Sequence, residues 1–238
     1  MTFNEYLCGN TYPGRGVLLG KMGNSALIGY FIMGRSTGSR NRVFELDGDG
    51  LRTRAFDESK LPDPSLYVYH AVRVFGNCTV VTNGEQTDTV YQYLRDGKTF
   101  EDALRTWTYE PDPPILTPRI SGLLTLENGG MSYKLSILKS GKDAAVIRQF
   151  FEYPEPVQGQ AHLIHTYAHD GNPVPSFSGE PAAIDVSGYT TLDDVTDALW
   201  NALDENNRVS LFTRMIDLTS GEMQMRVINK QGELLCKN

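Results

Sequence analysis

The stretch ISGLLTLENGGMSYKLSILKSGKDAAVIRQFFEY, residues 120–153, decides the class of fold. Three runs in it, 120–127, 130–138 and 144–153, are rich in the β-branched and aromatic residues typical of strands. Only the short turn sequences NGG and KSGKD separate them. Turns this short can join antiparallel strands but not parallel ones, which need a long crossover. The stretch therefore predicts three consecutive strands of one antiparallel sheet.

Further runs of strand composition lie on both sides of this stretch. They are GVLLG (16–20), ALIGYFIMG (26–34), LYVYHAVRVFG (66–76), CTVVTNG (78–84), RVSLFTRMI (208–216) and EMQMRVIN (222–229). The first two flank GKMGNS, which has the composition of a turn, and the next two meet at Gly76-Asn77, which is a hairpin signal. Many short strands joined by turns indicate an architecture built mainly from antiparallel sheets.

Helices are predicted in two clusters of the sequence. TDTVYQYLRDG (87–97) and TFEDALRTW (99–107) follow each other, and Thr99 and Asp102 have the spacing of a capping box. TTLDDVTDALWNAL (190–203) has Leu192, Val195, Leu199 and Leu203 at helical spacing along one face. With no internal repeat and no linker, residues 1–238 are expected to form one α+β domain, a layered sandwich of antiparallel sheets and helices.

Composition limits the partners of the chain. Its 238 residues carry a formal net charge of −7, which argues against nucleic acid as a ligand but permits one small anion held by local arginines. No apolar run is long enough to cross a membrane. The three cysteines form no CxxC pair, so we expect a reducing, cytoplasmic environment. A homo-oligomer is left open.

Three arginines gather in GYFIMGRSTGSRNRVF, residues 29–44. Arg35, Arg40 and Arg42 lie among glycine, serine, threonine and asparagine, a composition with which a short loop can surround a phosphate group. A solvated loop with no ligand would have the same composition, and other segments must decide between the two readings.

Several common site motifs are absent from the sequence. YPGRGVLLGK lacks the spacing of a phosphate-binding P-loop, and Leu19 stands where a dinucleotide fingerprint needs its third glycine. The residues around His162 and His165 favour a strand, on which these two side chains would point to opposite faces, so no metal site is predicted there. No motif marks a catalytic serine or cysteine. No cofactor is expected.

Two further segments carry polar residues next to predicted strands. VTNGEQTDTV (81–90) ends a strand with Asn83. A purely structural interpretation of this segment is a turn that caps the next helix. YEPDPPILTPRISG (109–122) places Glu110, Asp112 and Arg119 in a loop that four prolines stiffen. A stiff, charged loop suits a ligand site, although a purely structural turn has the same composition.

Taken in order, these segments resemble the archaeal-type IMP cyclohydrolase family, in a bacterial branch of it. The resemblance rests on GRSTGSRNRVF (34–44), YVYHAVRVFGNCTVVTNGEQTDTV (67–90), YEPDPPILTPRISG (109–122) and HTYAHDGNPVPSFSGEP (165–181). It implies the four-layer αββα sandwich of N-terminal-nucleophile hydrolases. It also implies the last step of de novo purine synthesis, in which 5-formamidoimidazole-4-carboxamide ribotide closes its ring to IMP and loses water.

The resemblance also implies a set of site residues. Arg35, Tyr69 and Glu110 match positions that the family uses for chemistry: Arg35 for stabilising an anion, Tyr69 for acid–base work at the formyl oxygen, and Glu110 for proton transfer at the amide. Candidates for contacts with the ribotide are Arg40, Asn41, Arg42, Asn83 and Arg119. The expected partner is thus a small-molecule nucleotide.

Two alternatives of other kinds remain open at this point. The first is a purine-nucleotide-binding protein on the same fold that turns nothing over. The second is a true N-terminal-nucleophile amidohydrolase, for which Thr2 or another small nucleophile would have to be freed at the mature N-terminus.

Overall fold

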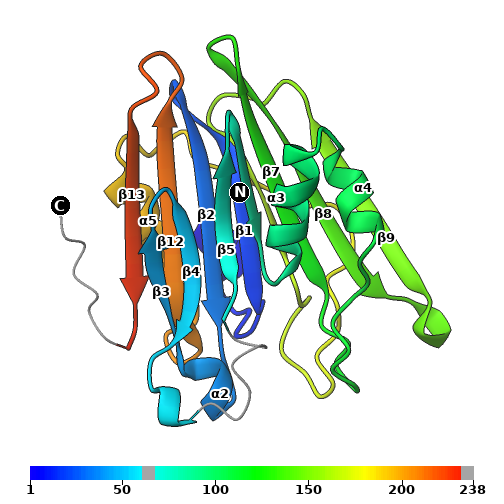
Figure 1. The fold of residues 1–238 in the computed structure, drawn as a ribbon. Helices are drawn as coiled ribbons and strands as arrows, with labels where there is room; N and C mark the ends of the chain where they lie inside the picture. The colour runs from blue at the N-terminus through cyan, green and yellow to red at the C-terminus, as the bar shows by residue number, and fades with distance from the viewer. Residues whose placement is uncertain (61–67, 232–238) are drawn as a thin grey trace.

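The computed structural model describes residues 1–60 and 68–231, and its strands form two antiparallel sheets (Figure 1). The first sheet has six strands in the order β11-β10-β1-β2-β12-β13. Their bounds are β1 (Arg15–Met22), β2 (Ser25–Met33), β10 (Gln160–His165), β11 (Ala182–Asp185), β12 (Arg208–Asp217) and β13 (Met223–Asn229). The pairing of β2 with β12 joins an early segment of the chain to a late one.

The second sheet has seven strands, which pair in the order of the sequence. Their bounds are β3 (Arg42–Asp47), β4 (Gly50–Ala55), β5 (His70–Phe75), β6 (Cys78–Thr82), β7 (Arg119–Glu127), β8 (Gly130–Ser140) and β9 (Val146–Tyr153). The three strands predicted in residues 120–153 are β7, β8 and β9, and both of their pairings are antiparallel. This prediction is confirmed.

The predicted hairpins are also confirmed. β1 and β2 pair from Arg15 with Ile32 to Met22 with Ser25. β5 and β6 pair on either side of the turn at Gly76-Asn77, with Phe75 opposite Cys78. Residues 66 and 67 of the strand predicted over 66–76 lie outside the described residues, and the strand itself begins at His70.

Two of the three predicted helices begin where side chains satisfy the free N–H groups of their first turn. α4 (Phe100–Arg105) and α5 (Leu192–Ala202) both start with a capping box, made by Thr99 with Asp102 and by Thr191 with Asp194. The 87–97 prediction corresponds to α3 (Gln86–Arg95). The apolar stripe predicted on residues 190–203 is buried as expected.

Three apolar clusters arrange these elements in layers. The largest fills the space between the sheets, with side chains such as Val17, Ile28 and Tyr30 from the first sheet and Phe44, Val81 and Ile120 from the second. α5 and the short α1 (Phe3–Leu7) pack on the outer face of the first sheet. α3 and α4 pack on the outer face of the second sheet, with α3 against β5 and β6, and Figure 1 shows both helices in front of that sheet.

Four short elements were not predicted from the sequence: α1, β3, β4 and β11. β3 and β4 are dense in charged residues, but the alternation in β4 puts Leu51, Thr53 and Ala55 inside and Arg52 and Arg54 outside. The Arg35–Arg42 segment, read from the sequence as one loop, contains the single helical turn α2 (Thr37–Arg40) and the start of β3. Within residues 1–60 and 68–231, no helix is long and apolar enough to span a membrane.

The α5 face should carry much of the stability of the first sheet. Leu199 is fully buried and faces Gly29 at the centre of β2. We expect Leu199→Ala to lower the free energy of unfolding by about 2–5 kcal/mol, through lost burial and the cavity left behind. Chemical denaturation measures this. Asp197→Ala, on the exposed side of the same helix, is the control and should change it by less than about 0.5 kcal/mol.

Candidate active site

One pocket forms where strand ends of both sheets meet the proline-rich loop. β1 and β7 begin there and β6 ends there. The pocket has a volume of about 130 Å³. It is lined by Arg15, Tyr69, Asn83, Gly84, Glu85, Glu110, Pro111, Asp112 and Arg119. Segments far apart in the sequence thus supply two arginines, a phenol and carboxylates to one small space.

Glu110 presents a carboxyl group without a structural task. Its backbone N–H donates to the Thr117 carbonyl, which fixes the start of the loop. Its side chain makes no hydrogen bond to any of the described residues. Burial raises the pKa of Glu110, against the opposing pull of the Arg15 and Arg119 guanidinium groups. A carboxyl group with its pKa moved toward neutrality is suited to proton transfer.

Asp112, two residues further on, is occupied by the loop itself. Its Oδ1 accepts the backbone N–H of Thr117 at 2.7 Å, and its Oδ2 accepts the Thr117 hydroxyl at 2.5 Å. The backbone carbonyl of Asp112 also accepts the N–H groups of Ile115 and Leu116. Of the two acidic residues considered from the sequence, Asp112 therefore orders the loop and Glu110 faces the pocket.

Tyr69 is held from two directions. Its backbone N–H donates to the Thr53 hydroxyl at 3.1 Å, and its carbonyl accepts the N–H of Thr53 at 2.9 Å. Its hydroxyl lies 2.8 Å from the hydroxyl of Tyr30 on β2, across the space between the sheets. Burial raises the pKa of Tyr69, so the phenol keeps its proton at neutral pH and can donate it.

Arginine side chains surround Tyr69 and Glu110. Arg15, the first residue of β1, is turned toward the space between the sheets, and its Nη1 lies 3.4 Å from the Tyr167 hydroxyl. Arg42, the first residue of β3, is 1% exposed, and its Nε donates to the Ser39 carbonyl. Burial and the nearby charge of Arg15 lower the pKa of Arg42. Guanidinium groups removed from water bind an anionic oxygen strongly.

Arg119 is positioned by a hydrogen-bond network from the end of β6. Its Nη1 donates to Gln86 Oε1, whose amide nitrogen donates in turn to Asn83 Oδ1. Asn83 also bonds to the backbone of Pro118 and Ile120 on either side of the arginine. A Cβ on Gly84 would lie 2.7 Å from Arg119 Nη1 and 2.7 Å from Gln86 Oε1, so a side chain at this position would displace both groups from their present places.

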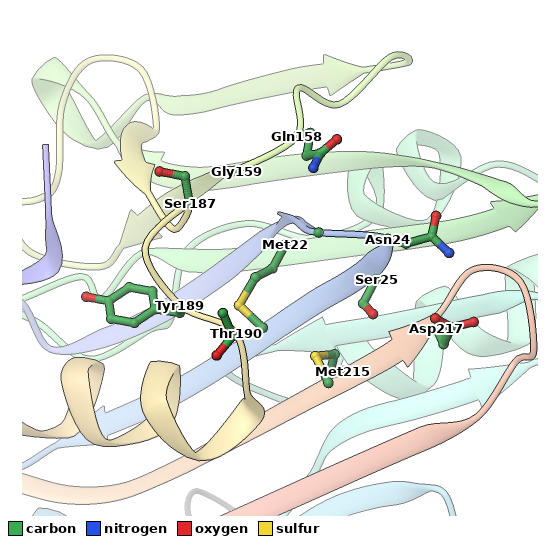
Figure 2. Close-up of a pocket in the computed structure, with 11 residues that line it drawn as sticks. Met22, Asn24, Ser25, Gln158, Gly159, Ser187, Tyr189, Thr190, Met215 and Asp217 are labelled. Atoms are coloured by element: carbon green, nitrogen blue, oxygen red, sulfur yellow. The ribbon is translucent and has the colours of Figure 1, made fainter.

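A second, wider hollow lies at the opposite end of the β1–β2 hairpin and is shown in Figure 2. Its volume is about 510 Å³. None of its eleven lining residues is arginine, lysine or histidine, and Asp217 Oδ1 already accepts the N–H groups of Thr219 and Ser220. Volume alone would favour this hollow, but its lining lacks the cationic groups that bind an anion.

The histidines do not form a metal centre. His162 Nδ1 lies 2.6 Å from the Tyr133 hydroxyl, between the sheets, whereas His165 Nε2 lies 2.7 Å from the Tyr6 hydroxyl on the side of α1. The two side chains thus point to opposite faces of β10, as the strand prediction required. Among the described residues, no group of three or more His, Cys, Asp or Glu could hold a metal ion.

Comparison with known proteins links this pocket to an enzyme family. A family model described as IMP cyclohydrolase-like protein matches residues 12–221, a range that includes every lining residue. The chain belongs to the IMP cyclohydrolase-like family. It is 29% identical to the IMP cyclohydrolase of Methanothrix thermoacetophila over 176 residues, covering 72% of this chain and 82% of that protein. It is 31% identical to the IMP cyclohydrolase of Thermococcus kodakarensis over 163 residues, covering 67% and 75%.

The structure brings part of the predicted set together in this IMP cyclohydrolase-like chain. Tyr69, Asn83, Glu110 and Arg119 line the pocket, and Arg42 lies close enough to influence Tyr69 and Glu110. The amide of Asn83 already bonds to its neighbours, so part of its role is structural.

The other predicted residues lie outside the pocket lining. Arg35 pairs with Asp170 and lies over the Tyr12 ring, with 4.6 Å to its centroid. Arg40 donates to the Gly34 carbonyl and to Asn207 Oδ1. Asn41 is buried and bonds to both backbone groups of Asp57. Ligand contact by these three residues stays a prediction.

Two residues at this site were missed from the sequence. Arg15 lies in YPGRG, a segment that the sequence analysis considered only as a phosphate-binding loop. Arg15 comes close to Glu110 only because β1 packs against the second sheet, and the sequence does not show this packing. Tyr30 lies in an apolar run and looks like core. The signal that could have found it is its position on the inward face of β2, in line with Ile28 and Ile32.

The free carboxyl group of Glu110 predicts a large kinetic effect. Glu110→Gln keeps the shape of the side chain and removes the titrating group. We therefore expect kcat for ring closure of the formamido ribotide to IMP to fall by about 10²–10⁴, with little change in KM. Asp112→Asn is the comparison; it should lower the melting temperature through the loop, with the smaller loss of kcat. If Asp112→Asn takes the larger loss of kcat, the assignment of the two carboxylates is wrong.

The raised pKa of Glu110 also sets the sign of a pH effect on stability. The folded chain holds this proton more tightly than the unfolded chain, so the stability of the wild type falls as pH rises from the ordinary glutamate value to the raised folded value. Glu110→Gln lacks this loss. Its melting temperature should match the wild type at low pH and exceed it at neutral pH.

Proposed function

We propose that this chain is an IMP cyclohydrolase, which closes 5-formamidoimidazole-4-carboxamide ribotide to IMP with loss of water in de novo purine biosynthesis. The observation that carries the proposal is the meeting of Glu110, Tyr69 and Arg15 in one pocket of a chain that belongs to the IMP cyclohydrolase-like family. These are an acid–base carboxyl group, a phenolic donor and a cation, and the reaction uses all three. The ligand is thus a small-molecule nucleotide.

The chemistry of ring closure explains why few groups suffice. The carboxamide nitrogen is a poor nucleophile and the formyl carbon a weak electrophile, but both belong to one molecule. Holding the two in an attack-ready conformation removes most of the entropic barrier. The protein must then take a proton from the attacking nitrogen, stabilise charge on the formyl oxygen and protonate the hydroxyl group that leaves as water.

We assign these tasks by position in the pocket. Glu110 takes the amide proton, because its carboxyl group is otherwise free of hydrogen bonds to the described residues. Tyr69 serves the formyl oxygen, because its phenol stays protonated at neutral pH. Arg15 stabilises negative charge on that oxygen, since it lies close to both residues, a role that the sequence alone gave to Arg35.

We propose that Arg42 and Arg119 bind the ribotide. Asn83 supports this binding by fixing the position of Arg119 through its hydrogen bonds to Gln86 and to the backbone. For Arg35, Arg40 and Asn41 we propose outer contacts on the phosphate side. Two stacked rings support this placement. The Tyr12 and Tyr167 ring centroids lie 5.5 Å apart, the Tyr167 hydroxyl approaches Arg15, and Arg35 lies over the Tyr12 ring. No cofactor or metal is needed for any of these steps.

We also propose that the two sheets with their outer helices form the αββα sandwich of N-terminal-nucleophile hydrolases, in one domain over residues 1–238. The shared apolar cluster between the sheets supports a single domain. The free thiols of Cys8 and Cys78 agree with a cytoplasmic location.

Two alternative functions, an amidohydrolase and a nucleotide-binding protein without turnover, can be distinguished from this proposal. An N-terminal-nucleophile amidohydrolase would need Thr2 at the reacting centre, but the Thr2 hydroxyl accepts the N–H of Glu5 in the capping box of α1, which packs on α5 and β11. The pocket opens at other elements. A nucleotide-binding protein without turnover would use the same pocket, and only an activity assay distinguishes it.

The direct test is turnover. Purified protein mixed with the formamido ribotide should produce IMP well above the uncatalysed rate, followed by ultraviolet absorbance as the purine ring forms. A preparation that is folded and binds IMP but gives none above that rate would favour the nucleotide-binding alternative.

The position of Thr2 predicts that it can be replaced. Thr2→Ala removes one helix cap, which costs about 0.5–2 kcal/mol of stability, and should keep cyclisation activity. Thr99→Ala removes the equivalent cap of α4 and is the matched control. An inactive Thr2→Ala protein, beside an active Thr99→Ala protein, would support the amidohydrolase instead.

A further inference from the structure

Tyr30 is a buried tyrosine whose hydroxyl has one partner. Its side chain has 0% exposure and its ring stacks on Phe44, with 5.3 Å between centroids. Among the described residues, the hydroxyl of Tyr69 at 2.8 Å is the only group that shares a hydrogen bond with the hydroxyl of Tyr30. Tyr30 belongs to β2 of the first sheet, whereas Tyr69 precedes β5 of the second, so this bond joins the two sheets behind the pocket.

The difference in burial fixes the direction of this bond. If Tyr69 donated to Tyr30, the hydrogen of Tyr30 would be left in the apolar core without an acceptor, which is costly. If Tyr30 donates to Tyr69, every hydrogen has an acceptor, because Tyr69 lines the pocket and its own O–H can turn toward a ligand there. The second arrangement satisfies both hydroxyl groups, and the first does not.

We propose that Tyr30 is the positioning residue that makes Tyr69 a hydrogen-bond donor into the pocket. The inference rests on the proposed function, in which Tyr69 serves the formyl oxygen. Tyr30 touches no substrate; it acts only by occupying a lone pair on the Tyr69 oxygen, which leaves the Tyr69 hydrogen directed at the ligand. The preferred ligand group at this point is therefore an acceptor oxygen on the formyl-derived carbon.

The direction of the bond also determines how protons move. When Tyr69 protonates the hydroxyl group leaving the formyl-derived carbon, the C–O bond breaks, water departs and the phenolate of Tyr69 remains. Tyr30 keeps its own proton and donates to that phenolate, while Arg15 and Arg42 lie close enough to stabilise the charge. The oxygen leaves as water and therefore receives two protons through Tyr69. The first is the proton that Glu110 takes from the amide nitrogen, and it turns the formyl oxygen into the hydroxyl group. The second comes from the formamide nitrogen, which loses its N–H proton to Glu110 as the ring C=N bond forms. Each proton passes from Glu110 to Tyr69, which restores both groups without any external reagent.

The kinetic test uses Tyr30→Phe, which removes one hydroxyl and keeps the ring on Phe44. We expect kcat to fall about 10- to 100-fold, with KM little changed, because a preorganised donor is lost while Tyr69 remains. In a Tyr69→Phe background, the same change should lower kcat by less than about twofold, because Tyr30 acts only through Tyr69. Tyr133→Phe is the matched control, since Tyr133 is also a buried core tyrosine with one hydroxyl partner, His162.

A binding measurement gives a readout that needs no turnover. Xanthosine monophosphate carries an oxygen on the ring carbon that derives from the formyl group, and IMP carries only hydrogen there. By calorimetry, the wild type should bind xanthosine monophosphate more tightly than IMP. Tyr30→Phe should weaken xanthosine monophosphate about two- to tenfold and leave IMP unchanged. Tyr133→Phe should leave both affinities unchanged.

The outcomes separate this inference from the proposed function. If no variant or wild-type protein turns over the ribotide but Tyr30→Phe selectively weakens xanthosine monophosphate, the cyclohydrolase proposal fails and the role of Tyr30 stands. If Tyr30→Phe keeps full kcat and full affinity for xanthosine monophosphate, the inference is overturned. The same holds if the wild type prefers IMP, or if Tyr30→Phe and Tyr133→Phe lower kcat equally and only with the melting temperature.

Discussion

Guanidinium groups held at the edge of an apolar core are the constraint on which the rest of this structure depends. Arg42 and Arg119 are almost fully buried, and Arg15 is turned toward the same space between the sheets. Taking an ion out of water costs several kcal/mol unless other groups replace the solvent. The surroundings provide part of that replacement: the Ser39 carbonyl, the Tyr167 hydroxyl, the Trp107 ring and the amide of Gln86. Among the described residues, Arg15 Nε and Arg119 Nε have no hydrogen-bond partner.

This constraint explains details that have no role in packing alone. Gly84 leaves room for the Arg119 guanidinium, which a Cβ at this position would displace. The side-chain amide of Asn83 hydrogen-bonds to the backbone on both sides of Arg119, so these groups are not free to bind a ligand. The proline loop is tied by Asp112 and Thr117, which brings Glu110 within reach of the positive charges. Much of the polar structure here serves to hold charges in place before any ligand arrives.

The sequence predicted the fold well where local signals are strong and less well where contacts between distant segments decide. Thr99 and Thr191 mark helix starts by themselves, and the turns after Glu127 and Phe75 fix two hairpins. β3 and β4 were not predicted from the sequence because their outward-facing residues are charged. α1 was not predicted because it has only about one and a half turns and is held by its neighbours. At the site, Glu110 and Tyr69 followed from resemblance. Arg15 and Tyr30 did not, because their significance comes from the sheet facing them, which no local pattern records.

The order of strands in the first sheet has a consequence for synthesis on the ribosome. β2 pairs with β12, so Gly29 meets Thr213 only after all seven strands of the second sheet have been made. The second sheet uses a continuous stretch of chain, from β3 to β9, and its pairings are all between successive strands. It can therefore form while the nascent chain is still growing, with its inner apolar face uncovered. Until β12 emerges, that face is a natural target for chaperones, and long-range pairing of this kind folds slowly.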